Sequence, residues 1–99
     1  MLNVNKTIEN GKATLTIEGR LDTVTAPELE KTMQEILPGL KELVLDFEKL
    51  DYISSTGLRI LLSAQKAMNG QGSMKVCHVN DTVMEIFEVT GFSDILTIE

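Results

Sequence analysis

The segment Ser54-Ser55-Thr56-Gly57, followed by Leu58-Arg59-Ile60-Leu61-Leu62, is the most informative part of this 99-residue chain. Three hydroxyl residues precede apolar residues at helical spacing, which places at least one hydroxyl at a helix N-terminus. Backbone N–H groups and the helix dipole favour negative charge there. A phosphate on Ser55 or Thr56 would therefore occupy a favourable anion site. The simpler interpretation is that Ser54 or Ser55 only caps the helix, a contribution of about 1 kcal/mol.

The segments on either side of this helix show strand and helix patterns in alternation. Two alternating apolar and polar runs are joined by Asn10-Gly11, which is typical of a β-hairpin. Thr25-Ala26-Pro27-Glu28 combines an N-cap threonine, a first-turn proline and a capping-box glutamate. The predicted elements are strands at 2–9 and 13–18, a loop at 19–24, a helix at 25–37, a strand at 43–47 buried on both faces, a loop at 48–54, a helix beginning near residue 55 or 56 and ending at 69–72, a strand at 74–79, a helix capped by residues 80–82 and stopped by Gly91, and a strand at 95–98.

This order predicts an α/β fold, in which an N-terminal β-hairpin is followed by alternating helices and strands. Short crossovers between the strands indicate a mostly parallel central sheet packed by helices. In such a sheet, partners meet the carboxyl ends of strands and the helix N-termini that follow. The turn around Ser54 and the loop before the first helix should both lie at that edge. We also expect Gly57, which has no side chain, to let a partner approach the backbone, so that Gly57→Arg would block binding without unfolding the protein.

Composition limits the possible partners and compartments. Hydrophobic residues make up 42% of the chain, enough for one globular domain spanning residues 1–99. The net charge of −6 argues against nucleic acid and against an anionic membrane surface. Cys77 is the only cysteine, apolar runs are too short to span a bilayer, and the start of the chain lacks a signal-peptide pattern. We expect a soluble cytoplasmic protein.

The segment from Leu45 to Leu62, which contains the three hydroxyls, resembles the signature of the STAS domain. This is the family of bacterial anti-sigma factor antagonists, and it also occurs appended to sulphate transporters. Upstream, residues 19–26 are similar to the family's glycine–x–leucine–aspartate segment before its first helix. Downstream, residues 87–92 are similar to the end of its third helix. The three matches come in the right order and cover nearly the whole chain.

The resemblance implies a protein-binding module that is switched by phosphorylation. In such antagonists, an anti-sigma factor that is also a serine kinase phosphorylates a serine at the start of the second helix. The unphosphorylated form binds the kinase and frees the sigma factor, and a serine phosphatase resets the system. The phosphorylated serine lies two residues before the motif's glycine, which makes it Ser55, with Thr56 as the secondary candidate. The implied partner surface consists of Asp22, Ser54, Ser55, Thr56, Gly57, Leu58 and Arg59.

The chain departs from the family pattern at two places. Many antagonists have aspartate immediately before the phosphorylated serine, where this chain has Ser54. The family also usually has a fourth helix after the last strand, whereas this sequence ends at Ile98-Glu99. Either an apolar patch is uncovered, or a partner or second copy covers it. We expect a monomer or weak dimer.

The remaining reactive residues give little sign of catalysis. Arg59 is either a solvated side chain or a contact to the partner or to a phosphate on Ser55. Cys77 and His78 are neighbours on a predicted strand, so their side chains should point to opposite faces and form no dyad. We expect a hydrogen-bonded, partly buried His78, no catalytic residue, no metal cluster and no cofactor. With no glycine-rich phosphate loop, the chain should not bind ATP itself.

Two other functions remain as alternatives. The chain could be a STAS domain that regulates another partner, such as a sensor complex or a transporter-associated regulator. It could also be a small enzyme or phosphocarrier using Ser55 or His78, but no general base is expected beside Ser55.

Overall fold

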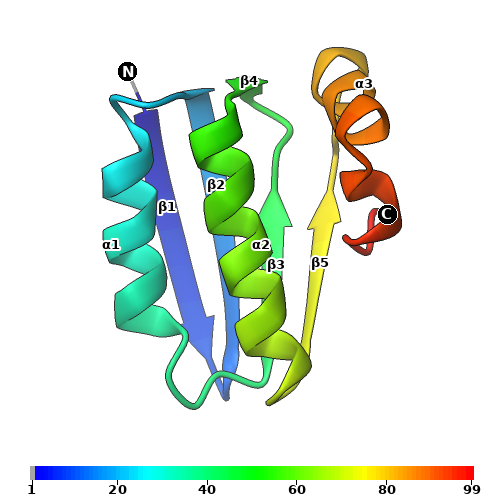
Figure 1. Cartoon of the computed structure of the whole chain (residues 1–99). Helices are drawn as coiled ribbons and strands as arrows, with labels where there is room; N and C mark the ends of the chain where they lie inside the picture. The colour runs from blue at the N-terminus through cyan, green and yellow to red at the C-terminus, as the bar shows by residue number, and fades with distance from the viewer. Residues whose placement is uncertain (1) are drawn as a thin grey trace.

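The computed structural model describes residues 2–99, and its elements follow the predicted alternation with one additional strand. The elements, drawn in Figure 1, are β1 (Leu2–Glu9), β2 (Lys12–Leu21), α1 (Ala26–Ile36), β3 (Glu42–Asp46), β4 (Leu50–Ile53), α2 (Ser55–Asn69), β5 (Ser73–Cys77), α3 (Asp81–Thr90) and the short 3₁₀ turn η1 (Phe92–Asp94). In this part of the chain, no helix is both long and apolar enough to cross a membrane.

The strands form one mixed sheet in which most neighbours are parallel. The strand order is β1-β2-β3-β5, and β4 pairs with the far end of β2. The β1–β2 hairpin is antiparallel, whereas β2–β3, β2–β4 and β3–β5 are parallel. Helices α1 and α2 lie side by side over one face, and α3 lies beside the carboxyl end of β5 (Figure 1). The predicted α/β fold with an N-terminal hairpin is confirmed.

The hairpin turn has the backbone conformation that its sequence predicts. Asn10 and Gly11 both have positive φ angles, 52° and 80°. Asparagine and glycine tolerate this left-handed region, and two such residues form the turn whose twist matches the flanking strands. The predicted pairing of the two alternating runs is therefore confirmed.

The predicted loops at 19–24 and 48–54 were wrong, because each contains strand residues. Strand β2 continues to Leu21, and Leu50–Ile53 forms β4 beside it. The pairing register shifts between Gly19 and Arg20, where Gly19 has a φ of 104°. This irregularity lets β2 pair with β3 along its first half and with β4 at its end. Strand β4 was not predicted, since four residues are too few for a recognisable alternation.

Two other predictions at element ends need correction. Thr25 precedes α1, but its side chain makes no capping hydrogen bond, so the expected capping box is absent. The predicted strand at 95–98 is reduced to one isolated bridge between Ile98 and Val76. Asn80 and Gly91, by contrast, cap and end α3 as expected, with Gly91 at a φ of 85°.

The core lies between the sheet and its helices and is mostly aliphatic. Leu15, Leu45 and Val76, from three neighbouring strands, are fully buried. Phe47 and Phe87 join the sheet to α3, with ring centroids 6.4 Å apart. Burial of this surface holds the helix ends in fixed positions at one edge of the sheet.

Candidate functional site

The turn before α1 and the start of α2 lie against each other, as the sequence predicted. The backbone N–H of Ser54 donates to the carbonyl of Leu21 at 2.8 Å. The hydroxyl oxygens of Thr23 and Thr56 are 3.4 Å apart. We call this place, formed by residues 22–24 and 54–56, the loop junction. It lies at the edge where α2 begins and β2 ends (Figure 1).

The three hydroxyl residues at the start of α2 have different surroundings. Ser54 is the N-cap, and its Oγ accepts from the Gly57 N–H at 3.4 Å. Thr56 is half-buried and faces Thr23. Ser55, the first residue of the helix, is exposed. Ser54 therefore fills the structural role of a cap, which an aspartate could fill equally well. The hydroxyl of Ser55 is the most accessible of the three.

Gly57 and Leu58 lie below the surface, so the predicted partner surface is corrected there. Gly57 is buried, and a Cβ at this position would come within 2.7 Å of Leu21 Cγ and 2.9 Å of Ile53 Cγ1. The glycine is needed for close packing of α2 on the sheet rather than for approach of a partner. Leu58 is only 6% exposed and belongs to the core.

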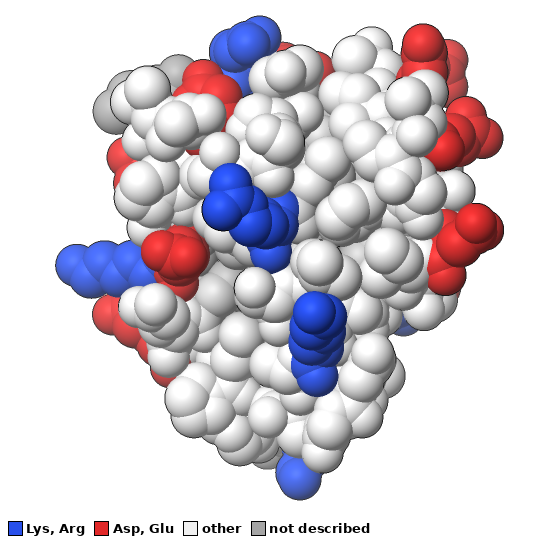
Figure 2. Space-filling model, viewed as in Figure 1, with Lys and Arg blue, Asp and Glu red and all other residues white. Residues whose placement is uncertain are grey.

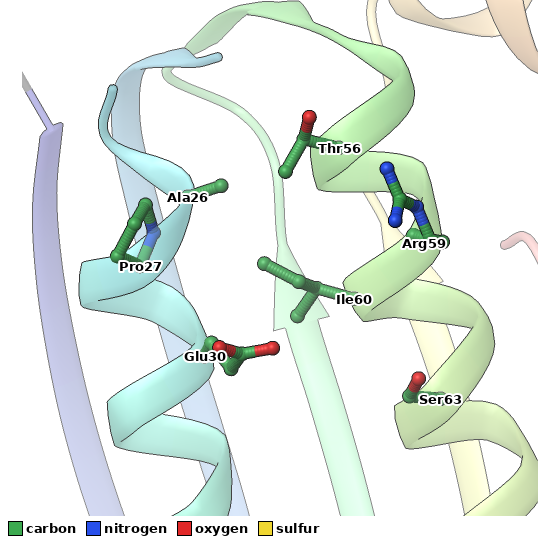
Figure 3. Close-up of a pocket in the computed structure, with 7 residues that line it drawn as sticks. All are labelled: Ala26, Pro27, Glu30, Thr56, Arg59, Ile60 and Ser63. Atoms are coloured by element: carbon green, nitrogen blue, oxygen red, sulfur yellow. The ribbon is translucent and has the colours of Figure 1, made fainter. Parts of the chain in front are cut away.

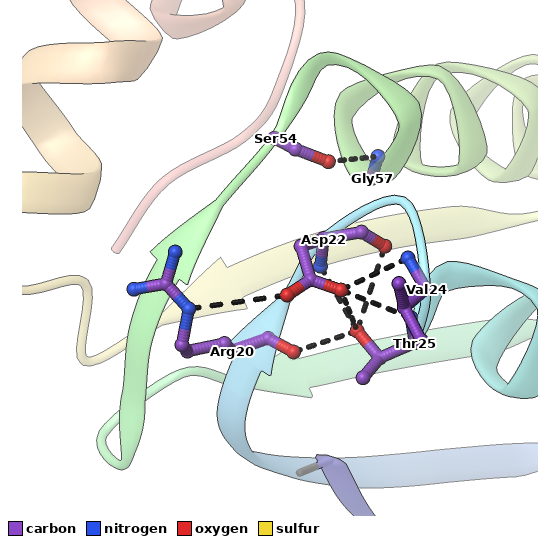
Figure 4. Close-up of polar contacts among 6 residues, drawn as sticks. All are labelled: Arg20, Asp22, Val24, Thr25, Ser54 and Gly57. Carbon is purple, nitrogen blue, oxygen red and sulfur yellow. Dashed lines mark hydrogen bonds and ion pairs between the residues drawn. The ribbon is translucent and has the colours of Figure 1, made fainter.

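Asp22 holds the turn before α1 in place. Its Oδ1 accepts hydrogen bonds from the N–H groups of Val24 and Thr25, each at 3.0 Å, and from the Thr25 hydroxyl at 3.1 Å (Figure 4). Arg20 Nε lies 3.9 Å from Oδ2. The pKa of the Asp22 carboxyl is lowered, chiefly by the hydrogen bond from the Thr25 backbone N–H. Partial desolvation raises the pKa and so opposes this effect, whereas the Thr25 hydroxyl, the Val24 N–H and Arg20 lower it further. Asp22 thus orders the turn that leads into α1, although it does not replace the side-chain cap that was expected from Thr25.

A shallow pocket of about 130 Å³ lies between the first turns of α1 and α2. Figure 3 shows Thr56, Arg59 and Ser63 on the α2 side and Pro27 and Glu30 on the α1 side. Arg59 therefore borders a groove that continues from the loop junction.

The face formed by α1 and α2 carries few charges at its centre. Figure 2 shows isolated basic side chains over α2 on an uncharged background, with acidic side chains gathered at the margins over α3 and beside α1. Next to this face, Val24 in the loop junction is 85% exposed. The sequence analysis missed Val24, because a single valine in a predicted loop gives no pattern. Its exposure next to Asp22, whose carboxylate accepts a hydrogen bond from the Val24 N–H, makes it a candidate contact residue.

The structure corrects the expected separation of Cys77 and His78. Strand β5 ends at Cys77, and His78 takes a left-handed φ of 58°, so the alternation of a strand no longer applies. Donor atoms of Asp46, Cys77 and His78 all lie within 4.8 Å of one another. His78 was expected to be partly buried, but its side chain is 58% exposed. Its predicted hydrogen bonding is confirmed by a 3.0 Å contact between Nδ1 and Asp46 Oδ1.

The comparisons with known proteins agree with this architecture. The family model of the STAS domain matches residues 3–99. A Bordetella bronchiseptica protein described as a candidate anti-sigma factor antagonist, BtrV, is 36% identical over 84 residues, which are 83% of this chain and 72% of that protein. The anti-sigma-B factor antagonist of Staphylococcus aureus is 29% identical over 97 residues, covering 96% of this chain and 90% of that protein.

Among solved structures, the unphosphorylated Bacillus anti-sigma factor antagonist SpoIIAA superposes with a TM-score of 0.82 at 14% identity. The match covers all of this chain and 88% of SpoIIAA. The phosphorylated form of SpoIIAA has the same fold, with a TM-score of 0.75 at 13% identity over all of this chain and 91% of that one. The chain therefore belongs to the STAS domain family.

Proposed function

We propose that this chain is an anti-sigma factor antagonist whose binding to an anti-sigma factor serine kinase is switched off by phosphorylation of Ser55. The observation that carries the proposal is the exposed position of Ser55 at the first residue of α2, inside the loop junction. Relatives that match most of the chain are named as anti-sigma factor antagonists. One structural relative is known in both phosphorylated and unphosphorylated forms.

The local electrostatics support a phosphate on Ser55. The first N–H groups of a helix have no partner within the helix, and the dipole favours an anion there. Arg59 lies four residues after Ser55 and so occupies the same side of α2. It can pair with the phosphate. The phosphorylated protein should therefore keep its fold.

The same charge is unfavourable at an interface. A phosphate on Ser55 adds about −1.5 to −2 charges to the loop junction, which also contains the Asp22 carboxylate and the exposed side chain of Val24. A partner that packs on the loop junction must then desolvate this group or present compensating cations. We infer that the unphosphorylated form binds the kinase and that a serine phosphatase restores it. The proposed contact residues are Asp22, Val24, Ser54, Ser55, Thr56 and Arg59.

Site-resolved phosphorylation tests the assignment. The protein is incubated with its cognate anti-sigma factor kinase and ATP, and the modified residue is located by mass spectrometry. Ser55→Ala should abolish incorporation of phosphate. Ser54→Asn, which keeps a helix cap, and Thr56→Val, which keeps the shape, serve as matched controls and should leave most of it intact. Modification confined to Ser54, Thr56 or His78 would show the assignment to be wrong.

A further inference from the structure

Three side chains of different chemistry converge on the face of the sheet away from the loop junction. Asp46 at the end of β3 and Cys77 at the end of β5 are direct partners in the parallel register. Their neighbours Leu45 and Val76 are fully buried in the core, so strand alternation directs Asp46 and Cys77 to the opposite face of the sheet. The residue after Cys77 is His78, and one donor atom of each of the three lies within 4.8 Å of the others.

Hydrogen bonds to the backbone hold this arrangement in place. Phe47 N–H donates to the Cys77 carbonyl at 3.0 Å, which fixes the two strand ends to each other. The carboxylate of Asp46 is held by the Glu48 N–H, which donates to Oδ1 at 3.0 Å. His78 has a positive φ of 58°, a conformation that non-glycine residues rarely adopt. It turns the imidazole back toward Asp46, with Nδ1 at 3.0 Å from Oδ1.

We propose that Asp46, Cys77 and His78 form a binding site for a divalent transition metal of the zinc type. A thiolate, an imidazole nitrogen and a carboxylate are the three ligand classes that zinc uses in proteins. Mg²⁺ and Ca²⁺ prefer six or more oxygen ligands and do not suit this set. The three residues supply three tetrahedral positions, and the fourth is open to water or to a donor from another molecule.

The three donor atoms can reach the separations of zinc ligands after small side-chain movements. Zinc lies about 2.0–2.3 Å from its ligands, so tetrahedral donors are separated by roughly 3.3–3.8 Å. Contraction from 4.8 Å requires shifts of about 1 Å, and the side chain of His78, which is 58% exposed, has room for such a shift. The net charge of −6 also favours a cation.

The composition of the chain makes the site easy to test. Cys77 is the only cysteine and His78 the only histidine, so each gives an unambiguous signal. Reduced, tag-free full-length protein is titrated with Co²⁺, a spectroscopic substitute for zinc, and the Co²⁺ is then displaced with Zn²⁺. We expect one metal per chain, a cobalt–thiolate charge-transfer band, and a shift of the imidazole proton resonances. Binding without that band, or with no effect on the imidazole resonances, would overturn the proposal.

Variants distinguish metal binding at this site from nonspecific metal binding to an acidic protein. Cys77→Ser should remove the charge-transfer band, and Cys77→Ser, His78→Gln and Asp46→Asn should each weaken binding at least tenfold, which is about 1.4 kcal/mol. Asp51→Asn makes the same chemical change as Asp46→Asn at an exposed position and should alter affinity by less than about twofold. Circular dichroism checks that each variant is folded. If Asp46→Asn does not fold, His78→Gln decides the test, because His78 is an exposed residue. Equal affinities in His78→Gln and wild type would contradict the proposal.

Discussion

At the scale of single residues, Gly57 shows how the absence of a side chain positions the candidate site. A Cβ at this position would collide with Leu21 and Ile53, so the glycine lets the first turn of α2 pack directly on β2 and β4. The same approach brings Ser55 next to the turn that contains Asp22. From the sequence, Gly57 was expected to let a partner approach the backbone, and its packing against Leu21 and Ile53 corrects that prediction.

We predict that Gly57→Ala destabilises the protein, although alanine favours helices. The new methyl group would lie 2.7 Å from Leu21 Cγ, and overpacking costs about 1–3 kcal/mol against a gain of about 1 kcal/mol in helix propensity. Gly57→Arg should be worse, so it cannot serve as a surface probe. The control is Gly70→Ala, whose added Cβ meets only the Ala67 carbonyl at an ordinary 3.6 Å. Chemical unfolding should show a loss for Gly57→Ala and little change for Gly70→Ala; equal stabilities would refute the packing role.

A second prediction at the residue scale concerns how much the Asp22 carboxylate stabilises the folded protein in acid. Its folded-state pKa lies below its ordinary value, chiefly because the Thr25 N–H donates to the carboxylate. A carboxyl with a lowered folded-state pKa binds protons more readily when unfolded, so its stabilising contribution is complete above about pH 4 and is lost as the pH falls through the folded-state pKa. In Asp22→Asn, the fall in melting temperature between pH 7 and pH 3 should be smaller than in wild type. An unchanged acid dependence would mean that the carboxylate contributes nothing to folding.

At the scale of elements, the residues that cap α2 and α3, Ser54 and Asn80, differ in the hydrogen bonds that their side chains make. Asn80 Oδ1 accepts from the Val83 N–H at 2.8 Å, and its Nδ2 donates to the Leu50 carbonyl at 2.6 Å, which ties α3 to β4. Ser54 makes one longer capping bond of 3.4 Å. We expect Asn80→Ala to cost about 2 kcal/mol and Ser54→Ala about 0.5–1 kcal/mol.

Urea unfolding of both cap variants measures this difference. Asn80→Asp is the matched control, because it keeps the cap acceptor and replaces the donor to the Leu50 carbonyl with a carboxylate oxygen. It should fall between wild type and Asn80→Ala. A larger loss in Ser54→Ala than in Asn80→Ala would contradict the ranking.

The sequence predicted long, strongly patterned elements well and short ones poorly. The hairpin and the three helices have clear period, turn and cap signals, as Asn10-Gly11 and Gly91 illustrate. Strand β4 has four residues and is defined by its pairing with β2 beyond the shift at Gly19, a tertiary effect. The strand predicted at 95–98 forms a single bridge to Val76, since an apolar sequence alone does not ensure a pairing partner.

At the scale of the whole molecule, the candidate site depends on contacts between distant segments. The sequence located Ser55 and Asp22 correctly at one edge, because strand ends and helix starts meet there. It could not show that Gly57 and Leu58 are buried or that Val24 is exposed, since these depend on how α2 packs. The grouping of Cys77 with His78 was missed because the left-handed backbone at His78 is invisible to strand periodicity.

Val24 offers a test of which end of the molecule binds the partner. Val24 in the loop junction is 85% exposed, and Val89 on α3 is 80% exposed, so the two form a matched pair. Val24→Asp should weaken kinase binding at least tenfold, through lost contact and added negative charge. Val89→Asp should bind as wild type does, and both variants should keep their stability. Calorimetric titration measures both; loss of binding only in Val89→Asp would place the interface on α3.

The most direct test is a titration of the anti-sigma factor kinase with this protein before and after phosphorylation of Ser55. The phosphorylated sample is purified to a single modification, and its circular dichroism is compared with that of the unmodified protein. We predict the same fold and an affinity about a hundredfold lower, which corresponds to about 3 kcal/mol. Equal affinities of the two forms, or loss of binding that results from unfolding, would contradict a switch based on local charge at the start of α2.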